Sequence, residues 1–202
     1  MMFDDIFDGP SGSTPLEEEE KETLRSKTIT TRGELNVEEE SNIASAEAWL
    51  RAKQMKIEVL LTVKQLQQIH KRMLNRVWKW AGKFRQSDKS IGILWWQIPT
   101  QLDSLCKDVL TQVKDSSPSR WMNDEIAIRF HHRLVQIHPF TDGNGRHARL
   151  VTDKLSTLLG ENEFSWGQTS LHAEGQAREK YVDALRAADL GDIGPLLVFA
   201  RS

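Results

Sequence analysis

The stretch His138-Pro139-Phe140-Thr141-Asp142-Gly143-Asn144-Gly145-Arg146-His147-Ala148-Arg149 decides the fold of this chain, because it joins two segments with helical periodicity. We expect one helix over about 123–136 and another over about 146–159. Two glycines at a junction between a loop and a helix permit positive φ angles that direct successive N–H groups into one hollow. The helix adds unsatisfied N–H groups and the positive end of its dipole. Gly143, Asn144 and Gly145 therefore predict an anion site, such as a phosphate site.

Charged side chains in the same stretch extend this prediction to a polyphosphate. Arg146 and Arg149 are three positions apart, so they share one helical face, and helical side chains lean toward the N-terminus and the predicted anion. Asp142 lies in the loop itself. Mg²⁺ prefers one or two carboxylates together with phosphate oxygens and water. The sequence therefore predicts a site for a magnesium-bound polyphosphate.

His138 stands where the first helix should end, and its chemistry suits a general base. An imidazole with an unperturbed pKa of about 6.5 can remove a proton from a hydroxyl that attacks phosphorus. An isolated Gly-Asn-Gly is usually a turn, and an isolated histidine is usually structural. Their combination with Asp142 and the two arginines favours catalysis. We expect Phe140 to be a buried anchor, His131 to pack between helices and His147 to lie on the surface.

The rest of the chain predicts an all-α helical bundle with one small β-hairpin. Thr62 followed by Gln65 should cap a helix that carries apolar residues at three- and four-residue steps. A hairpin is expected within 78–97, where β-branched and aromatic residues lie between glycines and charged positions. The other expected helices are a short one from Thr14 and segments over about 30–51, 102–113, 173–188 and 193–197. Glu38, Glu39 and Glu40 should form a solvated face of the helix over 30–51.

Composition limits the class of protein. The chain has 202 residues, of which 39% are hydrophobic, and its net charge is −2. This predicts one domain with no basic surface for direct nucleic-acid binding. Cys106 is the single cysteine, so we expect no disulfide, no multi-cysteine zinc site and a cytoplasmic location. No apolar run reaches 18 residues and no secretory signal is recognisable, which argues against a membrane or export. We divide the chain into a loose tail (1–13), N-terminal helices (14–61) and a catalytic core (62–202).

The string HPFTDGNGRHAR is identified as the signature of the Fic family, His-x-Phe-x-Asp/Glu-Gly-Asn-Gly-Arg-x-x-Arg. Further segments resemble the compact Fic group called mobile mystery protein B: TPLEEEE (14–20), TTRGELN (30–36), WKWAGKFR (78–85), FHHRLVQ (130–136) and ALRAADLGDIGPLLVFARS (184–202). The resemblance implies a Fic-type helical bundle. It also implies that AMP moves from ATP, with Mg²⁺, to a Ser, Thr or Tyr hydroxyl of a target protein, with release of pyrophosphate.

The resemblance also assigns roles to residues. His138 would be the general base, Asp142 the Mg²⁺ ligand, and Asn144 with the loop N–H groups the cradle of the α-phosphate. Arg146 and Arg149 would hold the outer phosphates. Phosphorylating relatives carry a lysine where this chain has Gly145, which implies nucleotide rather than phosphate transfer. A flap would align the target as an added strand, and a helix-turn-helix protein would be a partner. The flap residues are Ser90, Ile91, Gly92, Ile93 and Leu94.

Fic proteins are often restrained by a helix with the pattern Ser/Thr-x-x-x-Glu-Gly/Asn, whose Glu pairs with the last arginine of the motif. Thr30 and Glu34 fit this pattern, although Leu35 takes the Gly/Asn position. The segment 170–175 fits all of the letters. We favour Glu34, paired with Arg149, as the inhibitory residue. The alternative for Thr31 and Glu34 is an ordinary capping box.

Two other functions remain open. A metal-dependent phosphohydrolase would use a cluster of His131, His132, His138, Asp142 and His147, and would retain a transition metal after purification. A non-catalytic module would sense a nucleotide in the pocket while the flap binds a partner. Incubation with labelled ATP and Mg²⁺ distinguishes the three: label on protein indicates transfer, free phosphate indicates hydrolysis, and retention without turnover indicates sensing.

Overall fold

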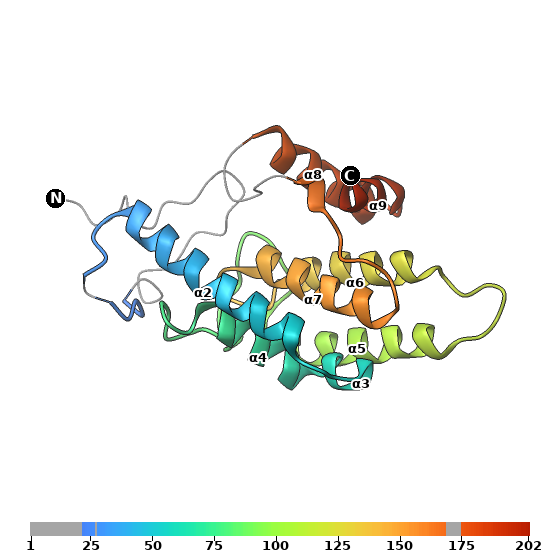
Figure 1. Ribbon diagram of the computed structural model, residues 1–202, viewed down its shortest axis with the longest axis horizontal. Helices are drawn as coiled ribbons and strands as arrows, with labels where there is room; N and C mark the ends of the chain where they lie inside the picture. The colour runs from blue at the N-terminus through green and yellow to red at the C-terminus, as the bar shows by residue number, and fades with distance from the viewer. Residues whose placement is uncertain (1–21, 27, 169–174) are drawn as a thin grey trace.

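The computed structural model describes residues 22–26, 28–168 and 175–202. The tail over 1–13, the short helix expected from Thr14, and most of the segment 170–175 lie outside these residues. The described part is mostly helical, as the sequence predicts (Figure 1). Its helices are α2 (Arg32–Ala52), α3 (Ile57–Leu60), α4 (Val63–Leu74), α5 (Ile98–Lys114), α6 (Asn123–Ile137), α7 (Asn144–Leu158), α8 (Gln176–Asp189) and α9 (Gly194–Arg201), with 3₁₀ turns η2 (Trp95–Gln97) and η3 (Trp166–Gln168).

Helices α6 and α7 form the centre of the bundle, and the motif loop connects them. In Figure 1, α2 crosses α4 and α7 on one side, α5 lies beside α6, and α8 with α9 covers the other side. The predicted apolar face of α4 is buried at Leu66, Ile69 and Met73. Thr62 caps α4 by accepting a hydrogen bond from the Gln65 N–H, at 3.2 Å, as the sequence predicts. No helix in the described part of the chain has both the length and the apolar composition needed to cross a membrane.

Asn42 fixes α2 against α4, although the two lie far apart in sequence. Its side-chain amide donates to the carbonyl of Arg72 at 2.8 Å and accepts from the N–H of Arg76 at 2.9 Å. The carbonyl of Arg72 is one of the last four of α4, which a helix leaves without an internal partner, and the N–H of Arg76 lies two residues beyond the end of the helix. The contact places the middle of α2 beside the start of α7, so residues of α2 can reach the motif.

The predicted hairpin is not formed. Over 85–94 the chain makes bends, and the described residues contain only two isolated bridges, Leu24 with Trp78 and Phe84 with Phe140. The buried side chain of Arg85 takes the place of a partner strand: Nε donates to the carbonyl of His138 at 2.7 Å, and Nη1 to that of Ser87 at 2.8 Å. A further bond from Nη2 reaches the carbonyl of Ile93. One buried guanidinium thus orders the loop and ties it to the motif.

We expect Arg85→Ala to lower the free energy of unfolding by about 2–4 kcal/mol, because three carbonyls lose a charged donor in a buried place. Urea unfolding at neutral pH measures this change. The matched control is Arg51→Ala, since Arg51 is 59% exposed and makes one surface ion pair with Glu163. Removal of such a pair should cost less than about 1 kcal/mol. Equal losses in the two variants would show that Arg85 does not organise the loop.

Candidate active site

His138 ends α6 in a left-handed backbone conformation, with φ 52°. Its N–H still bonds to the carbonyl of Leu134 at 3.2 Å, so the chain turns sharply after the last helical hydrogen bond. The ring is hydrogen-bonded to the backbone of Val135, and burial, followed by the charge of Arg85, lowers its pKa to about 4. The imidazole is therefore neutral at pH 7 and able to accept a proton.

The loop after His138 is held by side chains rather than by a strand. Asn144 accepts from the Phe140 N–H at 2.9 Å and donates to the Phe140 carbonyl at 2.8 Å. Its amide is thus engaged within the loop, and the group it can offer a phosphate is its backbone N–H. Phe140 is fully buried, as expected, and stacks on His70 with 3.7 Å between ring centroids.

His70, on α4, is a structural residue that sequence reasoning missed. Its Nδ1 accepts from the Gly82 N–H at 2.9 Å, so the proton lies on Nε2, which donates to the carbonyl of Asp142 at 2.9 Å. Burial lowers its pKa to about 3 and keeps the ring neutral. The only signal in the sequence is its place on the apolar face of α4, beside Ile69 and Met73. His70 fixes the backbone of the residue that the sequence assigns to Mg²⁺.

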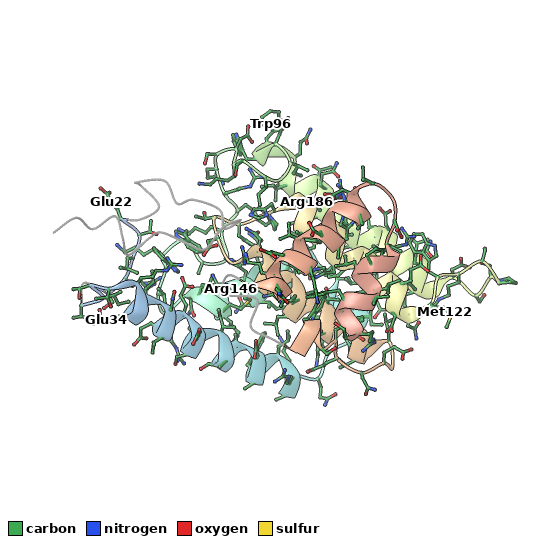
Figure 2. All side chains as sticks on the ribbon, turned by 90° about the horizontal axis from the view of Figure 1, so that it is seen from above. Glu22, Glu34, Trp96, Met122, Arg146 and Arg186 are labelled. Atoms are coloured by element: carbon green, nitrogen blue, oxygen red, sulfur yellow. The ribbon has the colours of Figure 1, made fainter. Side chains whose placement is uncertain are left out.

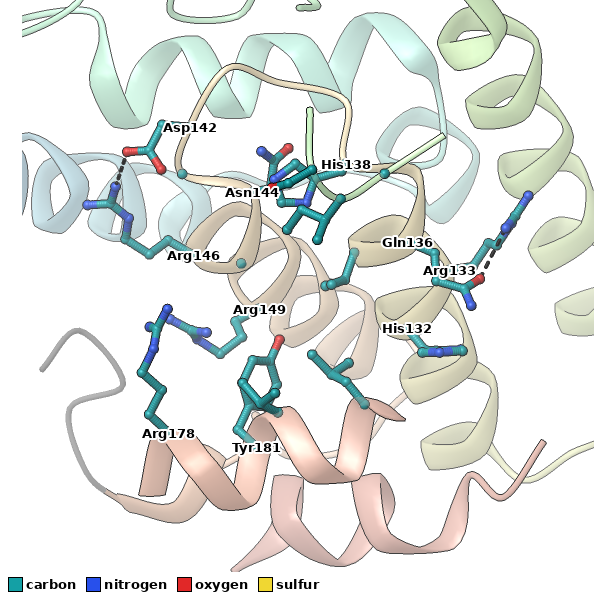
Figure 3. Close-up of a pocket in the computed structure, with 18 of the residues that line it drawn as sticks. His132, Arg133, Gln136, His138, Asp142, Asn144, Arg146, Arg149, Arg178 and Tyr181 are labelled. Atoms are coloured by element: carbon teal, nitrogen blue, oxygen red, sulfur yellow. Dashed lines mark hydrogen bonds and ion pairs between the residues drawn. The ribbon is translucent and has the colours of Figure 1, made fainter. Parts of the chain in front are cut away.

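The anion hollow has one left-handed glycine, not two. Gly143 precedes α7 with φ 75°, whereas Gly145 lies within the first turn of α7. A β-carbon on Gly143 would lie 2.8 Å from a methyl group of Leu74. The backbone around Gly143 therefore needs glycine for both conformation and space. Gly143, Asn144 and Gly145 line the cleft, which places the N-terminus of α7, with its unsatisfied N–H groups, at the cleft (Figure 3).

Arg146 is held between two carboxylates. Its Nη1 donates to Glu39 Oε2 at 2.6 Å, and its Nη2 to Asp142 Oδ2 at 3.1 Å. Glu39 is 5% exposed, and its Oε1 accepts from the indole N–H of Trp78 at 2.7 Å. The solvated face expected for Glu39 is therefore wrong. Its spacing from Leu35 and Ile43, which are both buried, is the sequence signal that places it on the inner face of α2.

The predicted pair between Glu34 and Arg149 is absent. Glu34 Oε2 accepts hydrogen bonds from the N–H groups of Thr30 and Thr31, at 2.8 and 3.1 Å, and these bonds lower its pKa. Thr31 in turn accepts from the Glu34 N–H, which completes a capping box at the start of α2. Figure 2 shows Glu34 at the outer end of this helix, away from Arg146. The carboxylate of α2 that reaches a motif arginine is Glu39.

These residues line one cleft with a cavity volume of about 1040 Å³. Its walls come from α2, the loop over 90–93, α6, the motif loop, α7 and α8 (Figure 3). His138, Asp142 and Gly143 line the cleft together with Arg146 and Arg149, and Val182 and Leu185 of α8 add apolar surface. The cleft thus combines a neutral base, a helix N-terminus, cations and an apolar surface.

Residues 60–156 match the Fic/DOC family. The chain carries a Fic/DOC domain. Over 149 residues, 69% of this chain, it is 34% identical to the protein adenylyltransferase Fic of Aedes aegypti and 33% identical to that of Drosophila melanogaster. The chain spans 27% of the length of these relatives.

Solved structures show the same fold. The N-terminal Fic domain of a VirB-translocated Bep effector from Bartonella quintana has a TM-score of 0.70 at 16% identity, with 92% of each chain covered. The BepC protein of Bartonella tribocorum, solved with bound AMPPNP, has a TM-score of 0.68 at 17% identity and covers 92% of this chain and 97% of its own. Fic-1 of C. elegans, at 26% identity, has a TM-score of 0.62 and covers 88% of this chain and 50% of its own.

The alternative metal cluster does not form in the Fic/DOC domain. Among the described residues, no group of three or more His, Cys, Asp or Glu side chains is arranged to hold a metal ion. His147 is fully buried, not on the surface as expected, and its Nε2 bonds to the carbonyl of Leu66 at 3.0 Å. His132 pairs with Asp189 at 2.8 Å. His131 packs between helices as predicted and bonds to Tyr181. These imidazoles point to different partners.

Proposed function

We propose that this Fic/DOC protein transfers AMP from ATP to a Ser, Thr or Tyr hydroxyl of a target protein. The observation that carries the proposal is a neutral, buried His138 at the mouth of an anion hollow formed by Gly143 and the first turn of α7. Arg146 and Arg149 line the same cleft. The curated relatives named protein adenylyltransferase support the reaction class.

The proposed reaction follows from these positions. His138 accepts the proton of the target hydroxyl, whose oxygen attacks the α-phosphorus. A new bond joins this oxygen to phosphorus, and the bond from phosphorus to the bridging oxygen of the β-phosphate breaks. Pyrophosphate leaves and AMP stays on the target. The N–H groups after Gly143 face the α-phosphate, and Arg149 faces the outer phosphates, so both stabilise charge that shifts as the bond breaks.

The site suits magnesium, with Asp142 as the ligand. Its carboxylate is 29% exposed and lies at the cleft, and Mg²⁺ is commonly held by one carboxylate with phosphate oxygens and water. When bound, the ion neutralises phosphate charge. Asp142 now pairs with Nη2 of Arg146, so metal binding would free this one guanidinium nitrogen for phosphate.

Residues 90–94 are proposed to align the target. Gly92 packs against the catalytic histidine, because a β-carbon there would lie 2.8 Å from the β-carbon of His138. The neighbouring Ile91, Leu94 and Trp96 are exposed, and Trp96 projects at the edge of the molecule in Figure 2. Exposed aromatic residues beside a site favour a protein partner. A cytoplasmic location and a helix-turn-helix partner, supported by the single cysteine and the family resemblance, complete the proposal.

The test is intact-mass analysis after incubation with ATP and Mg²⁺, with and without a cell extract as a source of targets. Addition of one AMP unit to protein supports the proposal. Addition of a single phosphate would contradict it and the role given to Gly145. Free phosphate without protein labelling would indicate hydrolysis, and bound nucleotide without turnover would indicate a sensing module.

We further propose that α2, within the N-terminal helices 14–61, restrains the core over 62–202 through Glu39. The buried carboxylate occupies Arg146, and a charged pair of this kind is stronger than a neutral hydrogen bond. Phosphate must displace Glu39 to use this arginine. Thr30 and Glu34, the residues favoured by the sequence, would then act indirectly, by capping the helix that carries Glu39.

Glu39→Gln is expected to raise self-modification with ATP and Mg²⁺ at least about tenfold, equivalent to about 1.4 kcal/mol of barrier. Glutamine keeps an acceptor for Trp78 but removes the charge that competes with phosphate. Radiolabel incorporation measures the rate. Glu38→Gln, on the exposed side of the same helix, is the control and should not activate. Activation by Glu34→Gln alone would return the inhibitory role to the residue that the sequence favours.

A further inference from the structure

Arg149 belongs to a buried chain of hydrogen bonds that links three helices. Its guanidinium carbon lies 5.7 Å from the ring centre of Tyr181, and the two side chains are hydrogen-bonded. The Tyr181 hydroxyl lies 2.9 Å from Nε2 of His131. His131 in turn bonds to the backbone of Ala148. The chain therefore runs from α7 to α8, then to α6, and back to α7.

The direction of every bond in this chain is fixed. His131 donates from Nδ1 to the carbonyl of Ala148, and the hydroxyl of Thr152 lies 3.4 Å from the same nitrogen. In the neutral ring Nε2 is therefore the acceptor, and the Tyr181 hydroxyl donates to it. The Tyr181 oxygen then accepts from Arg149, because an arginine can only donate. Burial lowers the pKa of His131 to about 3, which keeps the ring in this neutral form. In each bond, one group is therefore the donor and the other the acceptor, and these roles cannot be reversed.

Aromatic packing holds Tyr181 and His131, the two residues in the middle of this chain of hydrogen bonds. Tyr181 is the only tyrosine in the sequence, is 7% exposed, and packs on Phe199 of α9 at 5.6 Å between ring centres. The His131 ring lies 4.6 Å from that of Trp166. Tyr181 and His131 therefore provide a fixed point beside the cleft.

Arg149 needs such a fixed point, because it faces other cations. Burial lowers the pKa of Arg149, and the charge of Arg146, one turn away, lowers it further. Figure 3 draws the guanidinium group of Arg178 beside that of Arg149. Like charges repel, and an arginine side chain loses about 2 kcal/mol of rotamer entropy when it is held in one orientation. Without an acceptor at Tyr181, Arg149 would turn away before phosphate arrives.

We propose that Tyr181 and His131 are positioning residues that hold Arg149 toward the outer phosphates of the nucleotide. This inference rests on the proposed function, since it assumes that the cleft takes a nucleoside triphosphate. Neither residue needs to touch the nucleotide phosphates. Their effect is to place the cation in advance, so that less freedom is lost on binding.

The test compares the affinities for ATP and AMP, measured by calorimetry with Mg²⁺ and without any target. Tyr181→Phe removes one oxygen and should weaken ATP binding about tenfold, the value of one hydrogen bond to a charged group. AMP, which lacks the outer phosphates, should bind as before. In an Arg149→Lys background, Tyr181→Phe should change the ratio of the two affinities little. His131→Phe, which removes the acceptor of the Tyr181 hydrogen, should lower the ratio in the same direction and serves if Tyr181→Phe does not fold.

Ser156→Ala is the matched control. Ser156, like Tyr181, carries a buried hydroxyl, but it lies on α7 and donates to the carbonyl of Asn162, at 2.7 Å. The substitution should lower stability and leave the affinity ratio unchanged. An unchanged ratio in folded Tyr181→Phe, or equal weakening of ATP and AMP, would overturn the proposal. A wild-type protein that binds ATP but transfers nothing would refute the proposed function and leave this comparison valid.

Discussion

Replacing His138 with alanine is expected to lower the rate of nucleotide transfer by roughly 10²–10⁴-fold, the range of positioned acid–base catalysis. The neutral imidazole is the group in the motif that can take a proton from the incoming hydroxyl. Nucleotide binding should persist, because the hollow after Gly143 and the chain that holds Arg149 are unchanged. Single-turnover labelling with ATP measures the rate, and calorimetry measures binding.

His132→Ala is the control for this experiment. His132 lines the same cleft, but its ring pairs with Asp189 at the far side from the motif loop. Its loss should change transfer less than about tenfold, the effect of about one hydrogen bond. Residual activity above a tenth of wild type in His138→Ala would remove this residue from the role of base.

Lowering the pH from 7 to 5 is expected to reduce the free energy of unfolding by roughly 5 kcal/mol. Burial lowers the pKa of His70, His131 and His147 to about 3 and that of His138 to about 4. The unfolded chain binds these protons at about pH 6.5. Stability is therefore complete above this pH and falls as the pH drops toward the folded pKa values.

One carboxyl group acts in the opposite direction. Burial raises the pKa of Asp153 to about 7, so the folded protein takes up a proton between about pH 7 and 4 that the unfolded chain does not bind, which stabilises the fold. The loss from four histidines exceeds this gain. For a typical domain with about 5–15 kcal/mol of stability, the change is a large fraction of the total.

Urea unfolding at pH 7 and pH 5 measures this change. His147→Gln keeps a donor for the carbonyl of Leu66 but cannot titrate, so the difference between the two pH values should shrink by about 2 kcal/mol. Using the difference cancels any cost of the substitution that is independent of pH. Equal stability at pH 5 and pH 7 would show that these rings are protonated in the folded state.

The sequence predicted the features that depend on local spacing. The helices around the motif, the cap at Thr62, the left-handed Gly143 and the buried Phe140 all follow from neighbours within a few positions. The predicted hairpin is not formed, because the side chain of Arg85 supplies donors that a strand would supply from its backbone. Local sequence patterns do not show this contact.

The missed contacts join residues that are distant in the chain. Glu39 and Arg146 are 107 positions apart, and His70 and Asp142 are 72 apart. Helical periodicity places Glu39 on the inner face of α2, but it cannot say what that face meets. The partner depends on how α2 packs against α4, which Asn42 determines through bonds to the end of that helix.

The left-handed backbone of His138 is unfavourable for the fold, whereas its side chain is needed for the proposed reaction. A non-glycine residue with φ 52° carries a backbone cost that glycine would avoid. The backbone conformation at this position therefore favours glycine, which has no side chain to accept a proton. Replacing His138 with glycine would relax the turn and remove the proposed base at the same time, so the backbone cost cannot be relieved by glycine without losing proton transfer.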